Sequence, residues 1–214
     1  MESYKHNAVL VAHPDDETLW CGGALLMHPN DYWFILSICR KYDIDRAPRF
    51  RKALARYGAH GAMGNLDDDP EQIPLPSKIV EDMILELLPQ KTYELIITHS
   101  PFGEYTRHLR HEEVGKAVIN LWLQHKIATK ALWLFAYEDG NRTYYPRAIE
   151  VAHRCKKLPL KIWLEKYKMI TENYGFEKSG FEAKTTPEKE AFWQFKNPED
   201  ALTWINQKEA KVKD

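Results

Sequence analysis

Short apolar segments alternate with amphipathic segments along the first two thirds of the chain. Runs of aliphatic and aromatic residues predict four strands, at residues 8–12, 32–38, 95–98 and 131–137. Such runs between turn residues are typical of strands that are buried on both faces of a parallel sheet. Helical spacing of apolar residues predicts helices at about 18–27, 48–57, 77–88 and 112–124, with Ser77 as the N-cap of the third. This order of elements predicts an α/β fold with a mostly parallel sheet flanked by helices.

Two other stretches differ from this alternation. Residues 58–76 contain three glycines and three prolines, which predicts mostly loop with one short strand at most. After about residue 145 the pattern changes to helices, and the last of them is expected to begin at the capping sequence 197–200. Four residues of this region share one helical face that we expect to pack in the core: Trp163, Tyr167, Ile170 and Tyr174. We therefore expect a single domain over residues 1–214, with an α/β core at about 1–145 and a helical extension at about 146–214.

Composition narrows the class of protein. The 30 Lys and Arg residues nearly balance the 31 Asp and Glu residues, so the overall charge does not favour nucleic acid as a partner. Cys21, Cys39 and Cys155 are too few and too widely spaced for a disulfide framework or a CxxC zinc site, and we expect free thiols in a reducing compartment. The first residues do not resemble a secretory signal, and no stretch approaches the roughly 20 apolar residues of a membrane span. We expect a cytoplasmic protein without a transmembrane segment, and a membrane-attached substrate stays open.

Polar residues with metal-binding side chains follow the first strand directly. The sequence there is His13-Pro14-Asp15-Asp16-Glu17. Ligands of parallel sheets bind beyond the carboxyl ends of the strands, and imidazole with carboxylate can hold a divalent metal. The alternative is an acidic helix start that the helix dipole stabilises.

A second polar segment follows the strand at 95–98. His108 and His111 lie three residues apart at the start of the next predicted helix, so both can face one side. Alone this spacing is a weak signal, and surface positions are the alternative. Taken with the first segment, His13, Asp16 and His111 offer two nitrogens and one oxygen. Three protein ligands with an open position are typical of catalytic zinc sites.

These segments resemble the motifs of a known family. Residues 12–17 resemble the signature of the PIG-L/LmbE-like metal-dependent N-deacetylases, and the resemblance extends over roughly residues 7–140. It includes the Gly22-Gly23 pair, the strand ending at Thr98, and the His108-x-x-His111 motif. The resemblance implies a Rossmann-like fold and removal of acetyl from N-acetylglucosamine-type sugars, carried by a small amino-sugar conjugate or a glycolipid.

The resemblance also assigns roles to individual residues. It implies that His13, Asp16 and His111 bind the metal, that Asp15 is the general base, and that His108 is a protonated partner. In that role His108 stabilises the oxyanion or protonates the leaving amine. Zinc is the expected metal, and ferrous iron or cobalt suits the same ligands. Glu17 is expected to cap the helix or to orient a neighbour rather than to bind the metal.

The chain departs from the family pattern near the second motif. The family commonly has His-Pro-Asp-His, whereas this chain has His108-Leu109-Arg110-His111, so the residue that orients His108 is left unassigned. The candidate substrate-binding residues are Arg46, Asp67 (or its neighbour Asp68), Tyr105 and Arg110. Arg46, Arg49 and Arg110 together suggest an anionic substrate group, although the first two could equally be solvated residues at a helix start.

The sequence thus predicts a zinc-dependent N-deacetylase. One alternative is a metal-dependent hydrolase of a non-sugar amide or ester, and another is a non-catalytic sugar- or nucleotide-binding module. A serine hydrolase is not indicated, because no GxSxG motif occurs.

Overall fold

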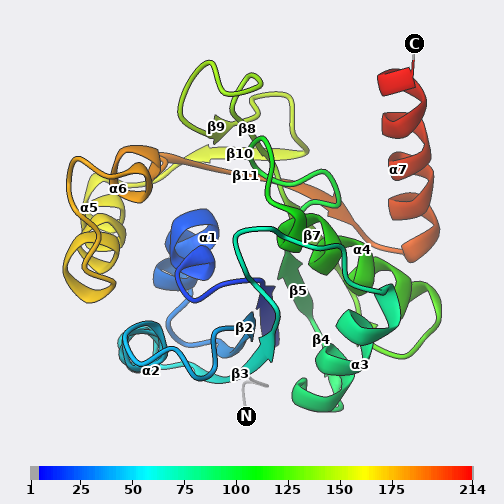
Figure 1. The fold of residues 1–214 in the computed structure, drawn as a ribbon, viewed down its shortest axis with the longest axis horizontal. Helices are drawn as coiled ribbons and strands as arrows, with labels where there is room; N and C mark the ends of the chain where they lie inside the picture. The colour runs from blue at the N-terminus through cyan, green and yellow to red at the C-terminus, as the bar shows by residue number, and fades with distance from the viewer. Residues whose placement is uncertain (1–4, 214) are drawn as a thin grey trace.

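The computed structural model describes residues 5–213, and its centre is a seven-stranded sheet with the order β10-β11-β7-β5-β1-β2-β3. Five neighbouring strands run parallel: β3 (His60–Leu66), β2 (Tyr32–Cys39), β1 (His6–Val11), β5 (Leu95–Thr98) and β7 (Leu132–Phe135). From β1 the chain builds outward first through β2 and β3, and then on the other side through β5 and β7. The predicted α/β architecture is confirmed (Figure 1).

Helices cover both faces of the sheet because its central strands are apolar on both sides. One face packs against α3 (Ser77–Leu87), α4 (Leu109–Leu123) and α7 (Pro198–Lys213). The other face packs against α1 (Asp16–Met27), α2 (Arg46–Tyr57) and the π-helix η1 (Met169–Asn173), which continues α5 (Leu160–Lys168). In Figure 1, α3, α4 and α7 lie to the right of the sheet, and α1, α2 and α5 lie to its left. Alternate residues of β1 serve the two faces, Leu10 on the first and Val9 on the second.

The C-terminal third contains the expected helices and two strands that the sequence pattern did not predict. Strands β10 (Arg154–Lys157) and β11 (Lys189–Phe195) extend the main sheet antiparallel beyond β7, with the short helix α6 (Phe181–Thr185) before β11. Ile170 and Tyr174 are buried as expected, whereas Trp163 and Tyr167 are half-buried and pack against each other. Four two-residue strands form two small ladders: β4 (Thr92–Tyr93) with β6 (Ala128–Thr129), and β8 (Tyr137–Glu138) with β9 (Arg147–Ala148).

A buried carboxylate of β11, Glu190, contacts both α1 and α5. Helix α1 is kinked at Cys21, and the backbone N–H groups of Gly23 and Ala24 donate to the Glu190 carboxylate at 2.7 and 2.8 Å. The ammonium of Lys166 donates to the same carboxylate at 2.8 Å. A Cβ at Gly23 would lie 2.5 Å from a methyl group of Leu158 and 2.9 Å from the Glu190 carboxylate, so any other residue here would displace these side chains.

Some element boundaries differ from the sequence-based expectation. The strand β3 covers seven residues of the segment expected to be mostly loop. Helix α4 begins at Leu109, three residues before the predicted start, and places His111 in its first turn. Ser77 is the first residue of α3 and makes no capping hydrogen bond, so the N-cap prediction is wrong. Cys21, Cys39 and Cys155 are free thiols, and no helix within residues 5–213 is long and apolar enough to cross a membrane.

Candidate metal centre

The two polar segments, which follow β1 and β5, meet at the point where the order of strands in the sheet reverses. Strand β1 lies between β2 and β5, and the connections leave its carboxyl end and that of β5 toward opposite sides. Such a switch point opens a crevice at the carboxyl edge of the sheet. His13 and Asp16 follow β1, and His99 and His111 follow β5, so all four side chains reach this crevice.

Three donor atoms converge there from the residues that the sequence singled out. The Nδ1 atom of His13 lies 3.1 Å from Oδ2 of Asp16 and 3.2 Å from Nε2 of His111. The third side of the triangle, His111 Nε2 to Asp16 Oδ2, is 3.4 Å. Three donors bonded to one ion at about 2.1 Å, with angles between about 95° and tetrahedral, are roughly 3.1 to 3.4 Å apart. The residues present therefore fit a divalent transition metal.

Each of these donors is oriented by a further partner. The far nitrogen of His13, Nε2, lies 2.8 Å from Oδ1 of Asp68, and the indole of Trp20 donates to Oδ1 of Asp16 at 3.1 Å. The Nδ1 atom of His111 lies 2.7 Å from Oε2 of Glu104. A carboxylate on the far nitrogen fixes the tautomer of an imidazole and directs its other lone pair inward.

Glu104 accepts hydrogen bonds from several residues that support the site, in addition to His111. Its Oε2 atom also accepts from Nδ1 of His99 at 2.9 Å, and its Oε1 atom accepts from the backbone N–H of Ser100 at 2.9 Å. Burial alone would raise the pKa of Glu104, but the two histidines outweigh it and lower the pKa to about 2. A charged carboxylate is thus held in the interior by the ring N–H groups of His99 and His111.

His99 is less suitable as a donor than His13. Acidic neighbours raise the pKa of His99 to about 9 despite its burial. However, the Nε2 atom of His99 accepts a hydrogen bond from the backbone N–H of Ala12 at 3.0 Å. A protonated Nε2 could not accept this bond, so the contact opposes protonation of the ring at that nitrogen. Because the Nε2 lone pair already accepts this bond, we do not assign His99 as a third metal ligand beside Asp16 and His111. Its ring instead stacks on His111 and supports these two residues.

The charge of the site depends mainly on the protonation of His13 and Asp16. Burial would lower the pKa of His13, but its hydrogen bonds to Asp16 and Asp68 raise it to about 10. Burial would raise the pKa of Asp16, but His111, His99 and His13 hold it well below its usual range. Without a cation between them, this cluster of acids thus holds a proton on His13, which a metal ion would replace.

Asp15 lies beside the donor triangle in a strained backbone conformation. Its φ of 127° is rare for any residue except glycine. The guanidinium of Arg46 donates to its Oδ2 atom at 2.6 Å and also lies over the ring of Phe176, 4.3 Å from the centroid. Burial and the nearby Asp16 charge nevertheless raise the pKa of Asp15 well above its usual value.

The strained backbone of Asp15 is held by a buried carboxylate. Glu17 is fully buried, and its Oε2 atom accepts from the backbone N–H of Asp15 at 3.0 Å. Its Oε1 atom accepts from the hydroxyls of Thr18 and Tyr174, both at 2.6 Å. Tyr174 follows η1, so the C-terminal third contributes to the geometry of Asp15.

The His108 ring packs against the rings of His13 and His111 and lines the cavity described below. Its ring centroid is 4.5 Å from that of His13 and 4.4 Å from that of His111, and the amide of Gln72 lies 3.1 Å from its ring nitrogens. Burial and the neighbouring imidazoles lower the pKa of His108 to about 3. This lowered pKa favours the neutral imidazole in the protein without a metal, whereas the expected role of His108 was that of a protonated partner, and the Gln72 amide contacts the ring.

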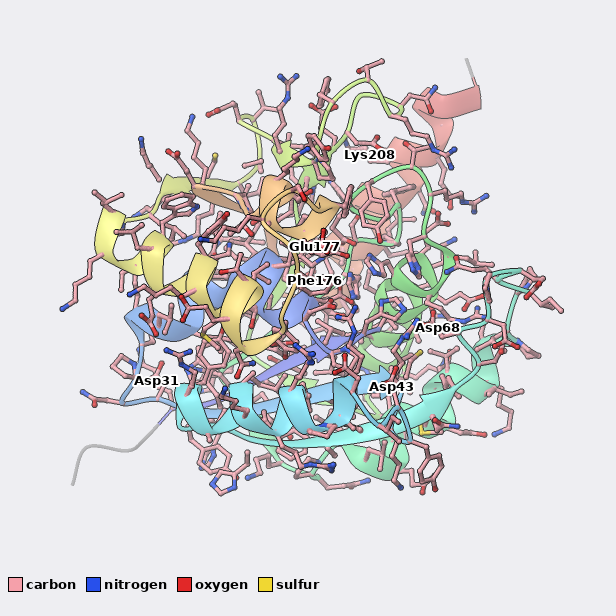
Figure 2. All side chains as sticks on the ribbon, turned by 60° about the vertical axis from the view of Figure 1, so that its left-hand side comes forward. Asp31, Asp43, Asp68, Phe176, Glu177 and Lys208 are labelled. Carbon is pink, nitrogen blue, oxygen red and sulfur yellow. The ribbon has the colours of Figure 1, made fainter. Side chains whose placement is uncertain are left out.

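A cavity of about 340 Å³ opens above these residues. Its walls include Asp15, His108, Tyr105 and Phe181, and the rings of Tyr105 and Phe181 lie 5.3 Å apart. Asp68 also faces the cavity, and it is labelled in Figure 2 on the loop after β3. Tyr105 thus lines the cavity, and its contact with a substrate stays a prediction.

Two predicted substrate contacts are not at the cavity. The Arg110 side chain is fully buried and donates to the carbonyl groups of Asp67 and Ile73 and to the Glu113 carboxylate, so the expectation that it binds substrate is wrong. Asp67 pairs with Arg110 at 3.2 Å, and Asp68 lies at the site instead.

The arginines of the suggested anion site have partners within the protein, which argues against an anion site there. Arg46 is paired with Asp15, and Arg49 with Asp45 and the Tyr174 carbonyl, so neither guanidinium is unpaired. Arg40, the other arginine at the cavity, is paired with Asp68 and Asp43.

Sequence reasoning missed Glu104 and Gln72, and it foresaw no supporting role for His99 or for Asp68, which it named only as a possible substrate contact. His99 had one usable signal, its place at the end of a strand, but no role follows from that alone. Glu104 and Gln72 lie in loops without a metal-binding spacing, and only the fold brings them to the histidines.

Comparison with known proteins gives matches in structure only. No family model matches the sequence, and no curated protein matches it. The N,N'-diacetylchitobiose deacetylase from Pyrococcus horikoshii is similar with a TM-score of 0.67 and 14% identity, over 91% of this chain and 85% of that one. The zinc-inhibited form of teicoplanin deacetylase Orf2 is similar with a TM-score of 0.57 and 14% identity, over 89% and 97%.

The same fold also occurs in a protein with different chemistry. GalB, the 4-carboxy-2-hydroxymuconate hydratase from Pseudomonas putida KT2440, is similar with a TM-score of 0.53 and 15% identity, over 89% of this chain and 95% of that one. At these identities the likeness establishes the fold. The sheet order and these matches show that the chain has the fold of the LmbE/PIG-L-type deacetylases.

Proposed function

We propose that the chain is a metal-dependent hydrolase that removes the N-acetyl group from an N-acetylglucosamine-type sugar conjugate. We also propose that it belongs to the PIG-L/LmbE-like family that its motifs resemble. The observation that carries the proposal is the convergence of His13 Nδ1, Asp16 Oδ2 and His111 Nε2 within 3.1 to 3.4 Å beside a strained carboxylate. The deacetylases of the same fold support the choice of reaction.

His13, Asp16 and His111 would hold the metal, which we propose to be zinc, with ferrous iron or cobalt suited to the same donors. An ion bound there acts as a Lewis acid toward a carbonyl oxygen and makes a water nucleophilic near neutral pH. Glu104 and Asp68 keep the two imidazoles in the tautomers that this binding requires.

Asp15 is the proposed general base. Its carboxylate takes the proton of the attacking water and can return it to the leaving amine, so one residue serves both proton transfers. Arg46 fixes the position of one carboxylate oxygen through the contact at 2.6 Å. The raised pKa of Asp15 suits this role, because a base works best when its pKa lies near the working pH.

His108 is proposed to act as a neutral hydrogen-bond donor. The Gln72 amide lies 3.1 Å from both ring nitrogens, and the single N–H of the neutral ring can donate to the substrate carbonyl as negative charge develops on the oxygen. Tyr105 and Phe181 are proposed to pack against the sugar conjugate. Residues 146–214 belong to the same catalytic unit in this proposal, because β11 joins the sheet and Tyr174 supports Glu17.

The test is acetate release from a panel of N-acetylglucosamine conjugates, measured together with metal content. Protein holding one metal ion should release acetate, and protein treated with a chelator should not. The metal is supplied at one equivalent, because one deacetylase of this fold is known in a zinc-inhibited form. Asp15→Asn should keep the metal and lose turnover, whereas Asp82→Asn, on the exposed face of α3, should behave as wild type. Release that is insensitive to the chelator, or none from any conjugate, would refute the proposal.

A hydratase is the second candidate, because GalB has the same fold. Its substrate, as named, carries carboxylate groups, which would need unpaired cations in the cavity. The two arginines that line this cavity, Arg40 and Arg46, are both paired with aspartates. This favours a neutral substrate and the deacetylase. The same panel, extended to unsaturated di- and tricarboxylates and to non-sugar amides and esters, separates these reactions. Ligand binding that survives chelation without turnover would indicate a binding module.

A further inference from the structure

A second cavity lies at the amino edge of the sheet, away from the metal centre. Its volume is about 300 Å³, at the lower end of the range for small-molecule sites. In Figure 2, Asp31 of this cavity and Asp68 of the metal centre are labelled on opposite sides of the molecule. The apolar side chains that line it come mainly from four strands (β2, β5, β7 and β11) and from α1, among them Trp33, Leu95, Trp133, Phe192 and Met27.

The topology of the sheet explains why an apolar hollow remains there. The helix that connects β5 to β7 is α4, and it packs on the opposite face. On the face of α1, the amino ends of β5 and β7 therefore line a cavity with Leu95 and Trp133. Exposed apolar surface in a concave site is typical of ligand binding.

The charged residues around this cavity are unequally paired. Its acids have partners within the protein: Glu190 binds Lys166 at 2.8 Å, and Glu94 binds Lys130 at 2.6 Å. Asp31 accepts a hydrogen bond from Asn7 at 3.0 Å.

The cations differ from the acids. Arg154 and Lys156 lie two residues apart on β10 and line the cavity together. The guanidinium of Arg154 lies over the Trp133 ring, 5.2 Å from its centroid, and neither cation forms an ion pair within residues 5–213. The edge of the cavity thus carries positive charge that the described part of the protein does not neutralise.

We propose that this cavity binds a small amphipathic carboxylate, with its apolar body between Trp33 and Trp133 and its carboxylate on Arg154. A guanidinium already placed against an aromatic ring keeps its donors in one plane, which suits bidentate binding of a carboxylate. An apolar molecule without charge would leave the cation unpaired, and a cationic one would be repelled. The site is independent of the metal centre and does not rest on the proposed hydrolase activity.

The test is titration of octanoate into chelator-treated protein, followed by the indole N–H signals in proton–nitrogen NMR spectra. Chelation removes the metal as a competing carboxylate site. The signals of Trp33 and Trp133, assigned with Trp33→Phe and Trp133→Phe, should shift with saturation, while that of Trp20 at the metal centre should not. Octan-1-ol and octylammonium, of the same chain length, should bind at least about tenfold more weakly, since a charge-assisted hydrogen bond is lost.

Matched arginine variants test the carboxylate contact. Arg154→Gln should weaken octanoate binding about tenfold or more, and Arg154→Lys should retain part of it. Arg147→Gln, which removes an exposed arginine paired with Glu138, should bind as wild type does. Equal binding of octanoate and octylammonium, unchanged affinity in Arg154→Gln, or shifts confined to Trp20 would each overturn the proposal.

Discussion

Replacing Glu104 by glutamine tests the metal centre through a residue that is not itself a donor in the proposed site. The glutamate accepts three hydrogen bonds, from Nδ1 of His99 at 2.9 Å, from Nδ1 of His111 at 2.7 Å and from the Ser100 backbone at 2.9 Å. Glutamine has nearly the same shape but offers one oxygen and one NH₂ group. It cannot accept all three bonds.

Both orientations of the new amide are unfavourable. With its oxygen toward the histidines, its NH₂ group faces the Ser100 N–H, and a buried donor loses its partner. With its NH₂ group toward the histidines, His111 must accept at Nδ1 and carry its proton on Nε2. That nitrogen lies 3.2 Å from Nδ1 of His13 and is the proposed metal donor, so a proton there competes directly with the ion.

The expected cost is a tenfold to hundredfold loss of metal affinity, the usual effect of removing a residue that orients a ligand. This corresponds to about 1.4 to 2.7 kcal/mol of binding free energy. Competition with a chromophoric chelator measures the dissociation constant, and thermal unfolding of the metal-free proteins shows whether the variant still folds. Glu86→Gln, on the exposed side of α3, is the matched control. A folded Glu104→Gln protein that binds metal within twofold of wild type would show that the His111 tautomer does not control binding.

Three further predictions concern proton transfer and stability. Because burial raises the pKa of Asp15, kcat/KM should rise with pH through a value above the ordinary carboxyl range, and a rise centred at pH 4 would contradict this. Asp15→Asn should lower kcat by about a hundredfold or more. Glu190→Gln leaves the buried Lys166 ammonium without a counter-charge. In denaturant titrations this variant should lower the free energy of unfolding by about 3 to 5 kcal/mol, and a loss below about 1 kcal/mol would be evidence against a tight pair. Burial lowers the pKa of His108 from 6.5 to about 3, so the unfolded chain binds a proton that the folded one does not. The metal-free protein should therefore lose stability as the pH falls from 6.5 toward 3, more steeply than His108→Gln does, and equal slopes would refute the assignment.

The central strands were predictable because they are buried on both faces and nearly every residue in them is apolar. Strand β11 was missed because it begins with Lys189 and Glu190, and a charged pair argues against a buried strand. The charge of Glu190 is tolerated only because Lys166 and the kinked α1 meet it in space. Strand β3, with two glycines, lacks the apolar run that marks the others.

The donor triangle could be predicted because its residues lie in short motifs at the ends of strands. The residues that orient the donors could not, since Glu104 and Asp68 act through contacts between distant loops. The same limit explains the error at Arg110. Its charge suggested contact with an anionic substrate group, whereas the fold surrounds it with carbonyl groups and Glu113.

The link from Tyr174 through Glu17 to the backbone of Asp15 has a consequence for protein engineering. Exchanging the C-terminal third with that of another protein of this fold would change more than the walls of the cavity. Unless the incoming segment supplies a hydroxyl at the same place, Glu17 loses a donor and the left-handed turn at Asp15 loses part of its support. Chimeras made to alter substrate choice should therefore lose turnover as well, and restoring a tyrosine at that position should recover it.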